Sequence, residues 1–148
     1  MNLFGVMGIS ASGLSAQRTR AEVVASNMAN AESTHTAEGG PYQRKEVVFQ
    51  SASPSSFRIQ LASSSASAFI GAAGGVTVRS IVADTASPIQ RYEPSHPDAD
   101  ANGFVSYPNI NPVLEMTDLM DASRAYQMNA SAVQAAKQMI QQSIELLK

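Results

Sequence analysis

The most regular pattern of apolar and polar positions lies at the C-terminal end of the chain. Asn111 is suited to cap a helix and Pro112 to occupy its first position, and neither glycine nor further proline follows. Two series of positions repeat every seven residues, offset by three: Leu119, Tyr126, Val133, Ile140 and Leu147, and Met116, Ser123, Ala130, Lys137 and Ile144. This heptad pattern predicts a helix over 112–148 with a seam for another helix, of which Ser123 and Lys137 are the polar interruptions.

A second amphipathic helix is predicted over residues 1–31. Its apolar stripe recurs mostly at spacings of three, four and seven, and consists of Met7, Ala11, Leu14, Ala21, Val24, Ala25 and Met28. The charged residues Arg18, Arg20 and Glu22 lie mostly off this stripe. Asn30 and the polar residues after it indicate the helix end and an exit loop.

The middle of the chain, residues 32–111, has no helical period and holds most of the prolines and glycines. Short runs of β-forming residues predict strands at 44–49, 57–61, 75–82 and 89–92. The Ser/Ala-rich stretch 51–67 predicts a mobile loop, and 94–108 an extended segment with a turn at Asn102-Gly103.

These elements predict a mainly α fold with a β-rich insert. Residues 1–31 and 112–148 are expected to pair as an antiparallel coiled coil, forming one discontinuous core domain, with 32–111 as an extended β-hairpin insert. The C-terminal helix, about 54 Å long at about 1.5 Å per residue, exceeds its partner. Part of its apolar stripe therefore stays uncovered in a monomer, which favours a chain that binds partners.

Composition points the same way. Charged residues make up 15% of the chain, against about 25% in ordinary soluble proteins, which favours burial in an assembly, although a weakly charged monomer stays open. The net charge is −2 and no long basic run exists, so a nucleic-acid partner is not expected. The absence of cysteine excludes disulfides, thiolate catalysis and Cys–zinc sites.

The first 13 residues lack the basic region, sustained apolar stretch and cleavage site of a standard signal peptide, and no stretch is long and apolar enough to span a bilayer. The chain is therefore expected to be either cytoplasmic or exported with its start intact.

Catalytic, cofactor and metal sites are not expected. His35 and His96 lie far apart in polar loops and have no partner ligands in the sequence. Residues 98–103 match the first half of a calcium loop, but the position of its closing glutamate holds Asn109, so we interpret the segment as a turn with Asx side chains bonded to the backbone.

Several motifs resemble those of the flagellar basal-body rod proteins, and in particular their proximal-rod members. The first helix carries Ser-Gly-Leu-Ser-Ala-Gln-Arg at 12–18 and Ala-Ser-Asn-Met-Ala-Asn at 25–30. Further matches are Glu-Gly-Gly-Pro-Tyr at 38–42, Arg-Lys-Glu-Val-Val-Phe at 44–49, the segment 96–109, Glu115-Met116, and 122–126 with Asn129 and Lys137. The resemblance covers both ends and much of the middle; residues 51–74 are the gap.

The resemblance implies a structural subunit of the rod that spans the periplasm, exported by the type III apparatus without a cleaved signal peptide and transmitting torque from motor to hook. It implies partners among other proximal-rod proteins, the distal rod and the adaptor at the MS ring and export gate. No small-molecule substrate is implied. The alternative from the helices alone is a cytoplasmic coiled-coil adaptor or export chaperone, which leaves the extended middle unexplained.

We expect the subunit interface to use the apolar helical positions. These are Leu14, Ala21, Met28, Met116, Leu119, Tyr126, Val133, Ile140, Ile144 and Leu147.

Overall fold

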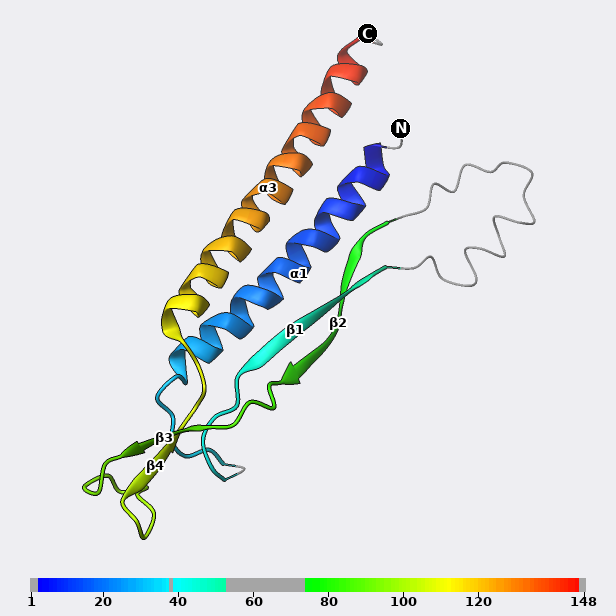
Figure 1. Cartoon of the computed structure of the whole chain (residues 1–148). Helices are drawn as coiled ribbons and strands as arrows, with labels where there is room; N and C mark the ends of the chain where they lie inside the picture. The colour runs from blue at the N-terminus through cyan, green and yellow to red at the C-terminus, as the bar shows by residue number, and fades with distance from the viewer. Residues whose placement is uncertain (1–2, 38, 53–73, 147–148) are drawn as a thin grey trace, which may run out of the picture. The chain divides into compact units, whose positions relative to one another are not determined.

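The computed structural model describes residues 3–37, 39–52 and 74–146 (Figure 1). In chain order the elements are α1 (Leu3–Ala29), β1 (Lys45–Ser51), β2 (Val76–Ala83), β3 (Ile89–Tyr92), β4 (Phe104–Tyr107) and α3 (Pro112–Glu145). The prediction of a helix near each end with a β region between them is confirmed. The pairing of the helices as a coiled coil stays a prediction.

Polar side chains set the helix ends that the sequence indicated. Asn111 caps α3: its Oδ1 accepts a hydrogen bond from Val113 N at 3.0 Å, and its carbonyl accepts one from Glu115 N at 3.1 Å. At the end of α1, Asn30 donates from Nδ2 to the carbonyl of Ser26 at 2.9 Å, and accepts a hydrogen bond from Ser33 Oγ at 3.1 Å. Backbone N–H groups at the start of α3 and a backbone carbonyl at the end of α1 thus bond to nearby polar groups.

The strands form two separate two-stranded sheets, β1 with β2 and β3 with β4. The β3–β4 hairpin is antiparallel, with Ile89 opposite Tyr107 and Tyr92 opposite Phe104. Strands predicted at 44–49, 75–82 and 89–92 are confirmed within one or two residues. The predicted strand at 57–61 and most of the predicted mobile loop at 51–67 lie outside the described residues.

Strand β4 corrects the prediction, which made 94–108 an extended segment with a turn but no strand. Its four residues pair with β3 after the turn at Asn102-Gly103. The turn itself is confirmed, since Gly103 has a φ of 81°. Four residues between a glycine turn and Pro108 carry too short a pattern to identify a strand alone; pairing with β3 stabilises it.

The chain divides into two compact units, each with parts of both helices. The first combines residues 1–19, 49–79 and 122–148, and the second combines 20–48 and 80–121. In the first unit the buried residues are small: Ser10, Ala16, Ala122 and Ala136. In the second they are Val23, Val24, Asn27, Val105, Pro108, Ile110 and Glu115, so a polar pair lies inside an apolar core. The predicted division into a helical core domain and an insert stays a prediction.

Candidate functional site

A buried polar cluster lies in the second unit and consists of Asn27, Tyr42, Arg44, Lys45 and Glu115; we call it the Asn27 cluster. The Asn27 side chain is 0% exposed, and its amide uses both of its ends. Its Nδ2 donates to the Lys45 carbonyl at 2.8 Å and to Glu115 Oε2 at 3.0 Å. Its Oδ1 accepts from Lys45 N at 2.9 Å and from Tyr42 OH at 3.2 Å. One side chain therefore ties α1, the start of β1 and α3 together.

Glu115 brings a carboxylate into this cluster at 1% exposure. Its Oε1 accepts a hydrogen bond from Arg44 Nε at 2.6 Å, and Arg44 also pairs with Glu46. Burial is the largest single influence on the pKa of Arg44 and lowers it, because burial disfavours the charged guanidinium. The hydrogen bonds to Glu115 and Glu46, together with the attraction of their charges, outweigh burial and raise the pKa of Arg44 above its ordinary value. A buried carboxylate with both oxygens bonded avoids the penalty of an unpaired charge.

A second, more exposed ion pair flanks the cluster. Arg20 on α1 lies 3.1 Å from the carboxylate of Asp118 on α3, and Arg44 approaches the same carboxylate at 3.8 Å. Since Arg20 and Asp118 are each about a third exposed, their ion pair contributes less to stability than the buried pair.

The first unit has its own polar contacts, at Ser12 and Gly13 of α1. The Ser12 hydroxyl donates to the Ile9 carbonyl at 2.7 Å and accepts from Val76 N at 3.1 Å, at the start of β2. A Cβ at Gly13 would lie 2.8 Å from Asn129 Oδ1 of α3. A larger residue at this position would force the Asn129 side chain to move.

The motif residues that carried the family resemblance thus meet inside the chain. Ser12, Gly13, Asn27, Arg44 and Glu115 come from four separate sequence segments, and each makes a contact between elements. These residues were expected only as parts of motifs, and no contact was predicted for any of them. The available signal was weak: a glycine in the interior of the first helix, where glycine is unfavourable, and a place for each residue in a motif.

The segment 96–103 forms the expected Asx turn. Asp100 Oδ1 accepts hydrogen bonds from Asn102 N at 2.8 Å and Phe104 N at 2.9 Å, and Asp98 Oδ2 accepts one from Thr34 Oγ1 at 2.7 Å. His96 Nδ1 accepts a hydrogen bond from Asp98 N at 3.1 Å. Protein donors therefore already engage both carboxylates.

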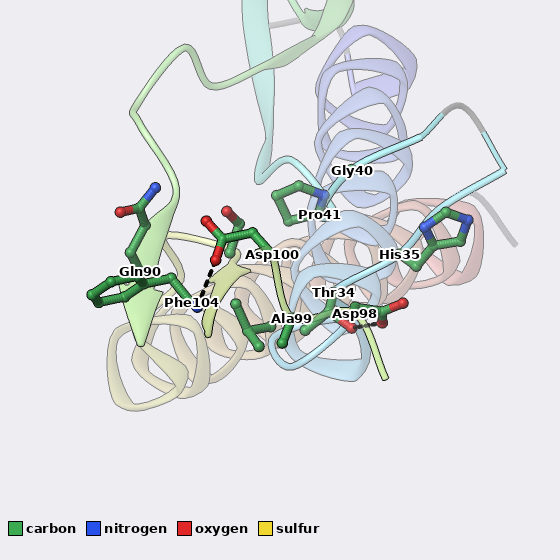
Figure 2. Close-up of a pocket in the computed structure, with 11 residues that line it drawn as sticks. Thr34, His35, Gly40, Pro41, Gln90, Asp98, Ala99, Asp100 and Phe104 are labelled. Atoms are coloured by element: carbon green, nitrogen blue, oxygen red, sulfur yellow. Dashed lines mark hydrogen bonds between the residues drawn. The ribbon is translucent and has the colours of Figure 1, made fainter. Parts of the chain in front are cut away.

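A pocket lies beside this turn (Figure 2). Its volume is about 330 Å³. It is lined by Thr34, His35, Gly40, Pro41, Gln90, Asp98, Ala99, Asp100, Phe104, Val105 and Ser106. Over the described residues, 3–37, 39–52 and 74–146, no three His, Cys, Asp or Glu side chains gather as a metal site would require. The helices described there include none long and apolar enough to cross a membrane.

The predicted interface residues differ in exposure. Met116, Tyr126 and Ile144 are 54%, 43% and 55% exposed. Six others are partly buried, namely Leu14, Ala21, Met28, Leu119, Val133 and Ile140. Leu147 lies outside the described residues. Their role between subunits stays a prediction.

The fully buried positions of α3 form a series that was not predicted from the sequence. Glu115, Ala122 and Ala136 are buried and stand at multiples of seven, with half-buried Asn129 completing the spacing. This series lies one residue before the expected Met116–Ser123–Ala130–Lys137 series, in which Met116, Ser123 and Lys137 are exposed. Small side chains such as Ala122 and Ala136 let neighbouring segments approach α3 closely, so they are buried. The prediction instead placed the buried face at large apolar residues such as Met116.

Large apolar side chains are exposed along the whole of α3. In the second unit they are Val113, Leu114, Met116 and Met120; in the first unit they are Tyr126, Met128, Met139 and Ile144, and Leu146 directly after the helix is exposed as well. Single exposed apolar residues are ordinary, but this many along one helix is typical of a surface that binds other molecules.

Comparison with known proteins identifies two matching family models. Residues 7–35 match the model described as flagella basal body rod protein, and residues 101–146 match the model described as flagellar basal body rod FlgEFG protein C-terminal. These ranges contain Asn27 and Glu115, the two residues most deeply buried in the Asn27 cluster.

Curated relatives from three bacteria, each named flagellar basal-body rod protein FlgC, match over the whole chain. The Bacillus subtilis protein is 39% identical over 152 residues, covering 100% of both chains. The Salmonella typhimurium protein is 40% identical over 147 residues, covering 99% of this chain and 98% of its own. The Borreliella burgdorferi protein is 34% identical over 158 residues, covering 100% and 99%.

These relatives carry the name of a rod protein and not of an enzyme, and they do not favour an adaptor or chaperone. The chain therefore belongs to the flagellar basal-body rod protein family, as a FlgC-like structural subunit of the rod.

Proposed function

We propose that this chain polymerises in the periplasm as a subunit of the proximal rod and so forms part of the shaft that transmits torque from motor to hook. The observation that carries the proposal is the number of exposed apolar side chains along α3, beside full-length similarity to FlgC proteins. Covering such side chains gains about 1.5–3 kcal/mol for each that becomes fully buried. A contact that joins two different surfaces and does not close repeats into a filament.

The helices are proposed to form an antiparallel coiled coil in the rod. In the second unit, Arg20 pairs with Asp118 while the later Asn27 bonds to the earlier Glu115, which is an antiparallel order. In the first unit, Gly13 lies against Asn129. The helical segments 1–31 and 112–148 would then act as one core domain, with 32–111 as an insert that bridges neighbouring subunits.

Neighbouring subunits are proposed to cover the predicted interface positions. Met116, Tyr126 and Ile144 support this role because they are exposed while belonging to the heptad pattern. Leu119, Val133 and Ile140 are half-buried, so each keeps part of its side chain available. Proposed partners are further copies of this chain, other proximal-rod proteins, the distal rod and the adaptor at the MS ring and export gate.

The route to the rod is proposed to be type III export of the unfolded chain without a cleaved signal peptide. Absence of cysteine suits such a route, because no wrong disulfide can form during passage. The Asn27 cluster joins segments far apart in the sequence, so it can form only after the chain has emerged at least as far as Glu115.

Electron microscopy of purified basal bodies tests the proposal. A small epitope inserted between residues 62 and 63, detected by a gold-labelled antibody, should mark the rod. A wild-type preparation without the epitope controls for antibody background. Label at the cytoplasmic export apparatus, with none on the rod, would reject a rod subunit and favour an adaptor.

A further inference from the structure

A chemically fragile dipeptide, Asn102-Gly103, lies in the loop between β3 and β4. Asn102 is exposed, and Gly103 has a φ of 81°. A Cβ at Gly103 would lie 2.9 Å from Tyr92 Cε2 and 3.2 Å from Pro94 Cβ. The left-handed backbone and the neighbouring ring both require glycine here, so the fold fixes a glycine directly after an asparagine.

This pair of residues favours loss of the asparagine amide. A glycine has no side chain to hinder its own backbone nitrogen, which can attack Cγ of the preceding asparagine. The nitrogen loses its proton and bonds to Cγ, the Cγ–Nδ2 bond breaks, and ammonia leaves, closing a five-membered imide. Water then opens the imide at one of its two carbonyls, giving aspartate or isoaspartate. Water is the only co-reactant.

The structure restrains this attack through Asp100. Gly103 N, the attacking atom, donates a hydrogen bond to the Asp100 carbonyl at 3.0 Å. The Asp100 carboxylate accepts from the backbone nitrogens on either side of Gly103, those of Asn102 and Phe104. The Gly103 carbonyl accepts from Glu93 N at 2.9 Å. Gly103 N must leave its hydrogen bond and turn toward the asparagine side chain before the imide can close.

We propose that Asn102 is a site of spontaneous deamidation whose rate Asp100 controls by holding the turn closed. The inference is independent of rod assembly. Deamidation adds a negative charge beside the cavity lined by Asp98 and Asp100. Isoaspartate also adds a backbone atom to a loop in which Gly103 bonds through both its nitrogen and its carbonyl, so the loop could not keep all of its hydrogen bonds.

The rate at Asn102 tests the proposal in the purified full-length chain. The chain and a synthetic peptide of residues 98–106 are incubated at mildly alkaline pH, and mass spectrometry with fragmentation measures the aspartate and isoaspartate products. The folded chain should react at least about tenfold more slowly, because one net hydrogen bond corresponds to about a factor of ten. Asp100→Ala should react within about threefold of the peptide, whereas Asp100→Asn, which keeps an acceptor oxygen, should stay slow.

Equal rates in the wild-type chain and the peptide would overturn the proposal, as would an Asp100→Ala chain that reacts no faster than wild type. Circular dichroism checks that each variant is folded. Hydrogen exchange at the Gly103 amide of the wild-type chain gives a test that needs no variant: strong protection is expected, and exchange at the peptide's rate would overturn the proposal.

Discussion

At the scale of single residues, Asn27 shows how a buried polar group can organise an interior. Its amide satisfies both the N–H and the C=O of Lys45, as a neighbouring strand would, and also binds Glu115 and Tyr42. Replacing a buried group that is bonded in this way leaves several partners unsatisfied at once.

Asn27→Asp should lower the free energy of unfolding by about 2–4 kcal/mol. The new carboxylate oxygen would face the Lys45 carbonyl and the Glu115 carboxylate, where an N–H group now donates. Chemical denaturation of the purified chain measures the change. Asn109→Asp makes the same substitution at an exposed position and should change stability by less than about 0.5 kcal/mol. Equal effects at the two positions would contradict the role of the Asn27 cluster.

Two glycines of α1 offer a matched pair of substitutions. Gly13→Ala should lower stability by about 1–3 kcal/mol, because its Cβ would displace Asn129 from the hydrogen bond to the Ala125 carbonyl. Beyond the adjacent residues and the helix's own nearby backbone, no heavy atom of the described chain lies within 4 Å of a Cβ added at Gly8, so Gly8→Ala should raise stability by about 0.5–1 kcal/mol. Thermal unfolding compares the two; a stabilising Gly13→Ala would exclude close helix contact at this point.

Tyr107 makes stability depend on pH in the alkaline range. The hydrogen bond from its hydroxyl to Glu93, at 2.9 Å, is the main cause of its raised pKa, and burial adds to it. Because the folded pKa exceeds the unfolded value of about 10, the unfolded chain loses this proton first. The contribution of Tyr107 is therefore complete below about pH 10 and decreases as pH rises through its folded pKa.

The contribution of the Tyr107 hydroxyl to stability is measured by comparing the unfolding midpoints of the wild type and Tyr107→Phe from neutral to alkaline pH. The stability difference between the two proteins should be constant below about pH 10 and should shift against the wild type above it. A difference that does not change with pH would show that the phenol ionises alike in both states.

At the scale of elements, the long helix was predictable and its buried face was not. The start of α3 is determined by Asn111, which caps it, and by Pro112 at its first position. No glycine or proline interrupts the residues that follow, so the sequence alone was enough to locate the helix. The choice of buried face depends on what approaches the helix. Gly13 admits Asn129, and Asn27 accommodates Glu115, so small and polar residues are buried while Met116 is exposed.

Val133→Asp tests the half-buried heptad position at the centre of α3. Its carboxylate would need to be desolvated without a partner, which costs several kcal/mol. We expect the chain to be expressed and exported but not to assemble into a rod, and the cells not to swim. Gln134→Glu changes the charge at the exposed neighbouring position and should be mild. Normal swimming with Val133→Asp, or equal damage from Gln134→Glu, would place the seam elsewhere.

At the scale of the whole molecule, the family was accessible from sequence because motifs in both helices and in the middle segment are specific, and the apolar pattern gave a helix near each end with a β region between them. The cluster that joins them was not accessible, since Asn27, Arg44 and Glu115 lie far apart along the chain and only folding brings them together. Strand β4 escaped notice for the same reason, as its pairing partner lies across an 11-residue loop, 93–103.

Two sets of side chains have different surroundings in this chain. Polar motif residues make contacts between its elements, and we propose that neighbouring subunits cover the exposed apolar residues of α3. Ile144 belongs to the second set: it is 55% exposed, lies in the last turns of α3, and is a predicted interface position. A change there should therefore affect assembly without affecting the fold.

The most direct test compares rod assembly by the Ile144→Asp variant with rod assembly by Gln142→Glu. Gln142→Glu is the control, because it adds the same charge to the same end of the helix. We expect both purified chains to unfold within about 0.5 kcal/mol of wild type, as surface changes do. Only Ile144→Asp should fail to give rods in basal bodies observed by electron microscopy. Intact rods containing Ile144→Asp would contradict the proposal that neighbouring subunits cover α3 at Ile144.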